Sequence, residues 1–223
     1  MTRVIAVDGP SGSGKSSTSR RVGQALGFLH VDSGALYRIM TWQCLAHGVD
    51  TADPAAVAAC AERVQVACRP ENGALAYYVD GEAPGARIRT PEINAHASPV
   101  ATVKAVRDRI TALLRGMARY GDLVVEGRDI TTVVFPDSPA RFYLTASAEV
   151  RARRRQLEEV ATGVANQSAE AVKASLLARD AIDSTRACAP LRKADGVLEI
   201  DSTRLTLDEV VATVLGALPA GWR

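Results

Sequence analysis

The chain has 223 residues, of which 47% are hydrophobic, and a formal net charge of +2. This length suits one compact α/β domain that carries insertions, so we expect a single domain over residues 1–223 rather than two independent ones. A nucleic-acid polymer or an anionic membrane surface requires a concentrated basic face, and the small net charge argues against both as partners.

The four cysteines form no C-x-x-C pair, and the three histidines are scattered, so the sequence predicts reduced thiols and no zinc site. No charged segment followed by an apolar one opens the chain, and no run reaches the ~20 apolar residues of a membrane span. We therefore expect a cytoplasmic protein that acts on small molecules, and we expect a monomer.

The first predicted elements surround a phosphate-binding loop. A buried strand is expected at 3–8 and a helix at 15–26, and between them Gly9-Pro-Ser-Gly-Ser-Gly-Lys-Ser16 has the G-x-x-x-x-G-K-[ST] spacing. Its glycines let backbone N–H groups turn toward a polyphosphate, at which the helix also aims its positive end. Lys15 adds a cation for the β and γ phosphates, and the Ser16 hydroxyl is placed to ligate Mg²⁺. The loop predicts ATP or GTP binding, and the alternative is a surface turn that binds nothing.

Residues 28–119 are predicted to contain a strand, an inserted lobe and two helices. A second strand is expected at 28–31, then a turn at 32–34 and a helix. Segment 50–98 has two short stretches in which apolar and polar residues alternate, which predicts a small antiparallel insertion that forms a lobe. A long helix is expected at 99–119, with Arg107 at the edge of its apolar stripe, so this half-buried cation requires a partner.

The second half of the chain alternates between strands and helices. Strands are expected at 123–126, 140–144 and 197–200, and helices are expected after Thr145, at 168–187 and at 206–218, the last with a Thr206/Glu209 capping box. A Gly-containing break at 163–167 makes 148–187 resemble a mobile lid. Five parallel strands joined by helices predict a doubly wound α/β sheet of the P-loop NTPase type, with its ligand crevice at the carboxyl ends of the strands.

Polar clusters follow two of these strands. Asp32-Ser33-Gly34, with Arg38 four residues on, should lie across the crevice from the phosphate loop, unless Asp32 or Ser33 only caps the helix and Arg38 is solvated. Glu126-Gly-Arg-Asp129 ends the third strand, where Glu126 can reach Mg²⁺ through a water. An exposed strand-end turn is the alternative for this second cluster.

Two further clusters lie on the predicted lid. Arg151, Arg154 and Arg155 share one helical face, and the plainer interpretation pairs Arg154 with Glu158 and Arg155 with Glu159. A second stripe has members at i, i+4 and i+7, namely Arg179, Asp183 and Arg186, which can equally be a surface ion-pair ladder. We find no nucleophile–base pair or carboxylate pair. Phosphoryl transfer does not require one, because a lysine, Mg²⁺ and several arginines supply positioning and charge stabilisation.

Taken together, several motifs resemble the bacterial cytidylate kinase family of nucleoside monophosphate kinases, in order and over nearly the whole chain. The motifs are Gly9-Pro-Ser-Gly-Ser-Gly-Lys-Ser16, Asp32-Ser-Gly-Ala-Leu-Tyr-Arg38, Ile88-Arg-Thr90, Glu126-Gly-Arg-Asp-Ile130, Thr132-Val-Val-Phe-Pro-Asp137 and Asp183 to Pro190. The resemblance implies transfer of the ATP γ-phosphoryl group to CMP or dCMP with Mg²⁺. It also implies that 50–98 contains the monophosphate-binding lobe and that 148–187 is the lid that closes on ATP.

The resemblance also implies roles for individual residues. ATP would be bound by Gly9, Pro10, Ser11, Gly12, Ser13, Gly14, Lys15, Ser16 and Ser17, with Ser16 on the metal. The catalytic cations would be Lys15, Arg128, Arg151, Arg154 and Arg155. The acceptor would be bound by Ser33, by Arg38, Arg128 and Arg186 on its phosphate, by Ser98, Arg107 and Asp129 on cytosine, and by Arg179 and Asp183 on the sugar.

One position departs from the family, which usually has Gly where this chain has Thr131. Because a β-branched residue does not easily adopt positive φ, we expect the loop that carries Asp129 to sit slightly differently. The alternatives are another P-loop small-metabolite kinase, such as a shikimate kinase, or a UMP/CMP kinase. A nucleotide switch protein would carry a guanine-reading Asn/Thr-Lys-x-Asp segment, which the sequence lacks.

Overall fold

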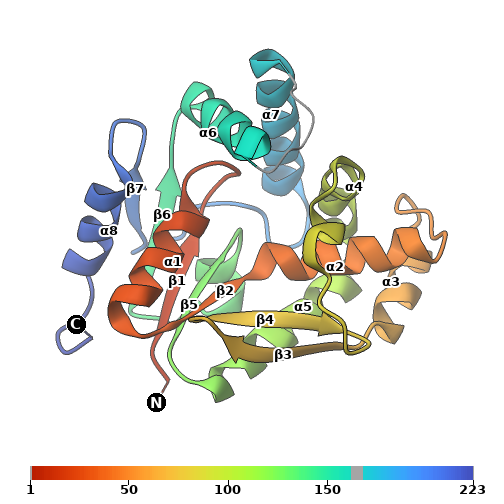
Figure 1. Cartoon of the computed structure of the whole chain (residues 1–223), viewed down its shortest axis with the longest axis horizontal. Helices are drawn as coiled ribbons and strands as arrows, with labels where there is room; N and C mark the ends of the chain where they lie inside the picture. Colours follow the sequence, from red (N-terminus) through yellow and green to blue (C-terminus); the bar gives the residue numbers. More distant parts are fainter. Residues whose placement is uncertain (1, 162–167, 223) are drawn as a thin grey trace.

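A computed structural model describes residues 2–161 and 168–222 (Figure 1). Its central sheet has the strand order β3-β4-β2-β5-β1-β6-β7. The strands are β1 (Val4–Asp8), β2 (Leu29–Asp32), β3 (Val66–Glu71), β4 (Ala74–Val79), β5 (Leu123–Gly127), β6 (Ala140–Thr145) and β7 (Leu198–Asp201). The helices are α1 (Lys15–Leu26), α2 (Ser33–Ala46), α3 (Pro54–Arg63), α4 (Pro91–Thr102), α5 (Lys104–Gly116), α6 (Ala148–Ala161), α7 (Ala169–Thr185) and α8 (Leu207–Gly216). Single turns lie at η1 (Gly85–Arg89), η2 (Met117–Tyr120) and η3 (Ile130–Val134), the last of them a π-turn.

Strands β1, β2, β5, β6 and β7 run parallel, so the predicted doubly wound α/β sheet is confirmed. The sheet is wider than predicted because the antiparallel pair β3–β4 adds to it. These two strands pair from Val66↔Val79 to Glu71↔Ala74, and one further pair, His30↔Ala74, joins β4 to β2. The antiparallel stretch expected within 50–98 is therefore an edge of the central sheet.

Each face of the sheet has its own apolar core. Val4 and Ala6 of β1 belong to a cluster with residues of α2, α3 and α5, whereas Ile5 and Val7 belong to a cluster with residues of α1 and α8. Successive strand residues point to opposite faces, so a strand covered on both sides must be apolar throughout. The helices thereby leave only the ends of the strands open for a site.

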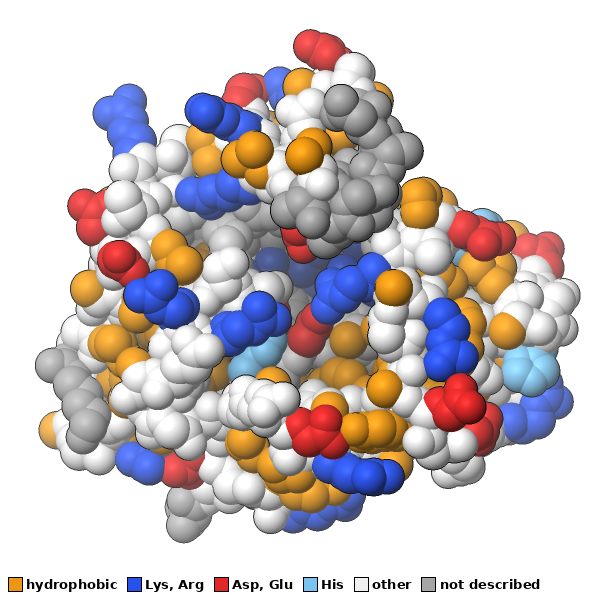
Figure 2. All heavy atoms as spheres, viewed as in Figure 1, with side chains coloured by type: hydrophobic (Ala, Val, Ile, Leu, Met, Phe, Trp, Pro, Cys, Tyr) orange, Lys and Arg blue, Asp and Glu red, His pale blue; other side chains and the backbone are white. Residues whose placement is uncertain are grey.

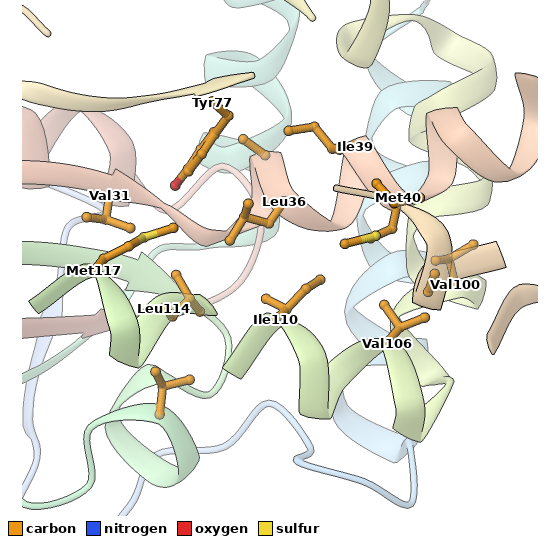
Figure 3. Packing of buried hydrophobic residues seen from close by; sticks show 14 of the residues in the cluster. Val31, Leu36, Ile39, Met40, Tyr77, Val100, Val106, Ile110, Leu114 and Met117 are labelled. Atoms are coloured by element: carbon orange, nitrogen blue, oxygen red, sulfur yellow. The ribbon is translucent and has the colours of Figure 1, made fainter. Parts of the chain in front are cut away.

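The prediction of one long helix at 99–119 is wrong, because the chain there forms two helices, α4 and α5, separated at Val103. This residue has extended backbone (φ −72°, ψ 118°) and ends α4, inside which Pro99 lies. The apolar stripe predicted for this region is present on α5, and Figure 3 shows Ile110 and Leu114 pointing toward α2. The start of α4 does carry a sequence signal that our reading missed, since Thr90 caps the helix and proline follows at its first position.

The prediction of a turn at 32–34 is also wrong, because β2 passes directly into α2. Asp32 is the last residue of the strand and also the N-cap, and its carboxylate accepts the Ala35 N–H at 3.1 Å. The capping alternative for Asp32 is thus correct, and it leaves Ser33 as the first residue of the helix. At α8 the predicted capping box between Thr206 and Glu209 is confirmed.

Helices α6 and α7 lie at the top of Figure 1, beyond the carboxyl ends of β1 and β6. They pack against each other through a small apolar cluster of Ala152, Val172 and Leu176. The break predicted at 163–167 lies outside the described residues. Within residues 2–161 and 168–222, no helix combines the length and apolar character that a membrane span requires. All four cysteines are free.

Candidate active site

A cleft of about 500 Å³ lies at the carboxyl ends of the strands, beneath α6 and α7. Figure 2 shows this hollow, with Lys and Arg side chains gathered around it. The predicted site residues that line it are Ser11, Gly12, Ser13, Gly14, Lys15, Ser16, Ser17, Ser33, Arg38, Ser98, Arg128, Asp129, Arg154, Arg155, Arg179, Asp183 and Arg186. Four predicted residues are absent from the lining, namely Gly9, Pro10, Arg107 and Arg151.

The phosphate-binding loop connects β1 to α1. Gly9 has φ 148°, and a Cβ there would lie 2.0 Å from the Leu144 carbonyl oxygen, so only glycine fits at this point. The Lys15 ammonium is buried against the loop and donates to the Pro10 carbonyl at 2.7 Å. Burial, with the Arg128 charge nearby, lowers the pKa of Lys15 to about 7. An anion held in the loop would supply the counter-charge that this lysine lacks.

Ser16, one residue further on, is oriented by the end of β5. Its hydroxyl donates to Glu126 Oε2 at 2.8 Å, and Glu126 Oε1 lies 2.9 Å from His30 Nε2. Glu126 and His30 are both buried, whereas Ser16 is exposed and lines the cleft, so the chain of hydrogen bonds leads from the cleft into the core. Among the described residues, no group of three or more His, Cys, Asp or Glu side chains could hold a metal ion by itself.

Arginines crowd the other side of the cleft. Burial, together with the charges of Arg128 and Arg38, lowers the pKa of Arg179 to about 10, and burial also lowers the pKa of Arg38 and of Arg186. Within the described part of the chain, Arg179 Nε and Arg186 Nη2 are buried donors without a hydrogen-bond partner. Buried donors of this kind are satisfied by a bound anion in many sites, and arginine binds phosphate through two N–H groups.

Asp183 lies among these arginines. Its carboxylate accepts from Arg128 Nε at 3.0 Å and lies 3.6 Å from Arg186 Nη1. The alternative of an ion-pair ladder along one helix therefore does not fully explain the position of Asp183, because its carboxylate also reaches across to the end of β5. At the start of α2, the pKa of Asp32 is lowered. Burial acts to raise it, but the charges of Arg38 and Arg89 outweigh that effect.

The partner that Arg107 requires is Asp129. The two side chains are 3% and 4% exposed and form a charge-assisted hydrogen bond, and Arg107 also donates to the Ala101 carbonyl at 3.0 Å. The guanidinium lies 5.4 Å from the centre of the Tyr37 ring. Asp129 thus lines the cleft with a carboxylate that Arg107, which is outside the lining, holds in position. Ser98 of α4 lines the same region.

The three predicted site arginines of α6 divide into two groups. Arg154 and Arg155 line the cleft, where Arg154 donates to Ser202 Oγ at 2.9 Å and Arg155 to Glu158 at 3.0 Å. The alternative in which Arg154 pairs with Glu158 is wrong, because Arg154 donates to the hydroxyl and the carbonyl of Ser202. The side chain of Glu159 lies outside what the structure describes. Arg151 is absent from the cleft lining and is buried against the phosphate loop, where it donates to the Ser11 carbonyl at 3.1 Å.

Asp8 is a buried residue beside the site that the sequence analysis did not identify, although it directly precedes Gly9 at a strand end. It is fully buried and accepts from the N–H groups of Ile130 and Thr131 at 2.8 and 2.7 Å and from the Thr131 hydroxyl at 2.6 Å. Thr131 does not have positive φ. The expected displacement of the loop by a β-branched residue has no basis in the backbone, because the threonine hydroxyl anchors the loop to β1.

We expect Thr131→Val to lower the free energy of unfolding by about 1.5–3 kcal/mol at pH 8, because the charged Asp8 loses a donor. Burial raises the pKa of Asp8 to about 6, against the hydrogen bonds from Thr131 and Ile130 that lower it. Removing the hydroxyl raises this pKa further, so the difference from wild type should shrink as the pH falls below 6, where both proteins carry protonated Asp8. Urea unfolding at pH 5 and pH 8 measures it, and a pH-independent difference would contradict this account.

The phosphate loop, the mostly parallel sheet and an arginine-lined cleft beneath α6 and α7 define a P-loop phosphotransferase. The family model described as Cytidylate kinase matches residues 5–219. The chain therefore belongs to the cytidylate kinase family.

Curated relatives agree with this assignment. A cytidylate kinase from Streptomyces avermitilis is 44% identical over 214 residues, which cover 95% of this chain and 90% of the relative. One from Shouchella clausii is 40% identical over 211 residues, covering 95% and 93%. Among solved structures, a gluconokinase from Sinorhizobium meliloti matches with a TM-score of 0.50 at 16% identity, covering 97% of this chain and 91% of that one. The structural match shows a shared fold only.

Proposed function

We propose that the protein transfers the γ-phosphoryl group of ATP to CMP or dCMP, giving ADP and CDP or dCDP. Membership of the cytidylate kinase family shows a phosphotransferase, and the family name gives the acceptor class. The observation that carries the proposal is that one cleft contains two centres for anions. The phosphate loop with Lys15 lies on one side, and the arginines around Asp183 lie on the other.

On the donor side, Gly9 to Ser17 bind the triphosphate of ATP. Lys15 meets the β and γ phosphates, and phosphate contact returns the buried ammonium to its charged form. The Ser16 hydroxyl fits Mg²⁺, since a serine oxygen beside a buried carboxylate is the hard oxygen chemistry that this ion prefers. When bound, Mg²⁺ neutralises charge on the phosphates, and Glu126 orients Ser16 toward it.

On the acceptor side, Arg38, Arg128 and Arg186 bind the monophosphate. The crowding of their charges, and the buried Arg186 donor that has no hydrogen-bond partner among the described residues, support this role. Ser98 and Asp129 contact the cytosine, with Arg107 behind Asp129 as its positioning partner. Arg179 and Asp183 contact the sugar, and both line the cleft.

The chemistry follows from this arrangement. Charge in the transition state spreads over the equatorial oxygens of the transferring group, and cations held at fixed positions stabilise it without reorganising. The proposal assigns this task to Lys15, Arg128, Arg154 and Arg155, which all line the cleft. Closure of 148–187 on ATP and the transferring group excludes water, which would otherwise hydrolyse ATP.

The substrate assignment is tested by coupled ADP release with ATP, Mg²⁺ and one acceptor at a time. We expect turnover with CMP and dCMP, and AMP tests whether the site also accepts a purine. UMP tests whether the Arg107–Asp129 pair discriminates the pyrimidines, and shikimate tests the small-metabolite alternative. Turnover with CMP and dCMP no higher than with ATP alone would refute the proposal.

A further inference from the structure

Helix α7 touches the phosphate loop through Asp180, a residue that lies outside the cleft lining. Asp180 Oδ1 accepts the Ser11 N–H at 3.3 Å, and Oδ2 is ion-paired with Arg151 of α6. Arg151 in turn donates to the Ser11 carbonyl at 3.1 Å. The N–H and the carbonyl of Ser11 are thus both held by the ion pair of Arg151 and Asp180, whose side chains are 8% and 15% exposed.

The contact between loop and lid is tight. A Cβ at Gly12 would lie 2.9 Å from the Arg151 carbonyl oxygen, so the backbone of α6 abuts the loop directly. Arg151 Nε donates to the Ala146 carbonyl at 3.1 Å, which anchors the arginine at the base of its helix. A rearrangement of the loop must therefore be accommodated at this junction of Ser11, Arg151 and Asp180, because close-packed groups do not deform freely.

The same helix holds the acceptor side of the cleft. Asp183 lies three residues after Asp180, on a neighbouring face, and is bonded to Arg128 at the end of β5. Arg179 and Arg186 of this segment line the cleft as well. One turn of α7 therefore connects the loop expected to hold ATP with the residues expected to hold CMP.

We propose that Asp180 is a positioning residue that couples the binding of the two substrates through α7, an inference that rests on the proposed function. A triphosphate orders the loop, and through Ser11 and Arg151 it orders α7. The acceptor then binds residues that already hold their positions, so its affinity rises in the presence of the donor. The Asp180 carboxylate also acts electrostatically on Lys15, which places it within the field of the bound phosphates.

The test is calorimetric titration of CMP with and without a non-hydrolysable ATP analogue and Mg²⁺. For the wild type we expect the analogue to tighten CMP binding at least about fivefold. Asp180→Asn keeps the size of the side chain and an acceptor for the Ser11 N–H but loses the charge that holds Arg151. For Asp180→Asn we expect the CMP affinities with and without the analogue to differ by no more than about twofold. We expect Arg151→Met to lose the coupling in the same way. Glu170→Gln, a change at an exposed acid in the first turn of α7, should retain the wild-type ratio.

The outcomes separate the two levels of the argument. If Asp180→Asn lowers the melting temperature but keeps the wild-type ratio, Asp180 is only structural and the coupling role is refuted. A wild type that binds CMP with the same affinity in both conditions also overturns it, while leaving the proposed function intact. A wild type that does not bind CMP at all contradicts the proposed function itself. Coupling lost in both junction variants but not in Glu170→Gln supports the inference.

Discussion

Replacing Lys15 with Met is expected to lower kcat by about a thousandfold and to leave the protein at least as stable as the wild type. The loss follows because Lys15 is the cation of the phosphate loop, and no other lysine lines the cleft within the described residues. The retained stability follows because burial makes the charged ammonium unfavourable in the protein without substrate. Steady-state kinetics and thermal unfolding measure the two effects.

The size of the stability change depends on pH. The pKa of Lys15 is lowered from 10.5 to about 7 in the folded protein, so between these values the unfolded chain binds more protons. Wild-type stability gains from this group as the pH rises through that window. The advantage of Lys15→Met should therefore be largest at pH 7 and below and should disappear toward pH 10.5. Lys193→Met, at a half-exposed lysine paired with Glu199, is the matched control and should change neither property.

The buried pair of Arg107 and Asp129 should show the largest effect on stability. Asp129→Leu leaves the Arg107 charge in the core, and we expect a loss of about 3–5 kcal/mol in the free energy of unfolding. The double change Arg107→Met with Asp129→Leu removes both charges, and most of the lost stability should return. Activity with CMP should stay low in both variants, because the carboxylate that faces the cleft is gone.

Urea unfolding of the two single variants and the double variant completes a double-mutant cycle. A double variant as unstable as the sum of the single ones would mean that the two side chains do not act as a pair. Recovery of stability together with recovery of CMP kinase activity would show that Asp129 has no role in acceptor binding. The cycle thus separates the structural role of the pair from its proposed role with substrate.

Local patterns carried the sequence predictions that are confirmed. The phosphate loop, the apolar runs at β1, β5 and β6 and the capping box at α8 each depend on residues a few positions apart. The error at 99–119 has a local cause as well, because an apolar stripe at helical spacing continued through Val103 and concealed a break. Here the weaker signal of a cap and a proline at the start of α4 was correct.

What the sequence by itself determined is the chemistry available: a phosphate loop with Lys15 and Ser16, and an excess of arginines at strand ends and on two helices. Only the tertiary structure decided which arginines reach the cleft. Arg151, Arg154 and Arg155 share one helical face, yet Arg151 is drawn beneath the loop by Asp180, 29 residues away, while the other two line the cleft. The physical reason is that helical spacing determines which side chains point together, whereas partners brought close by folding determine where a buried charge is neutralised.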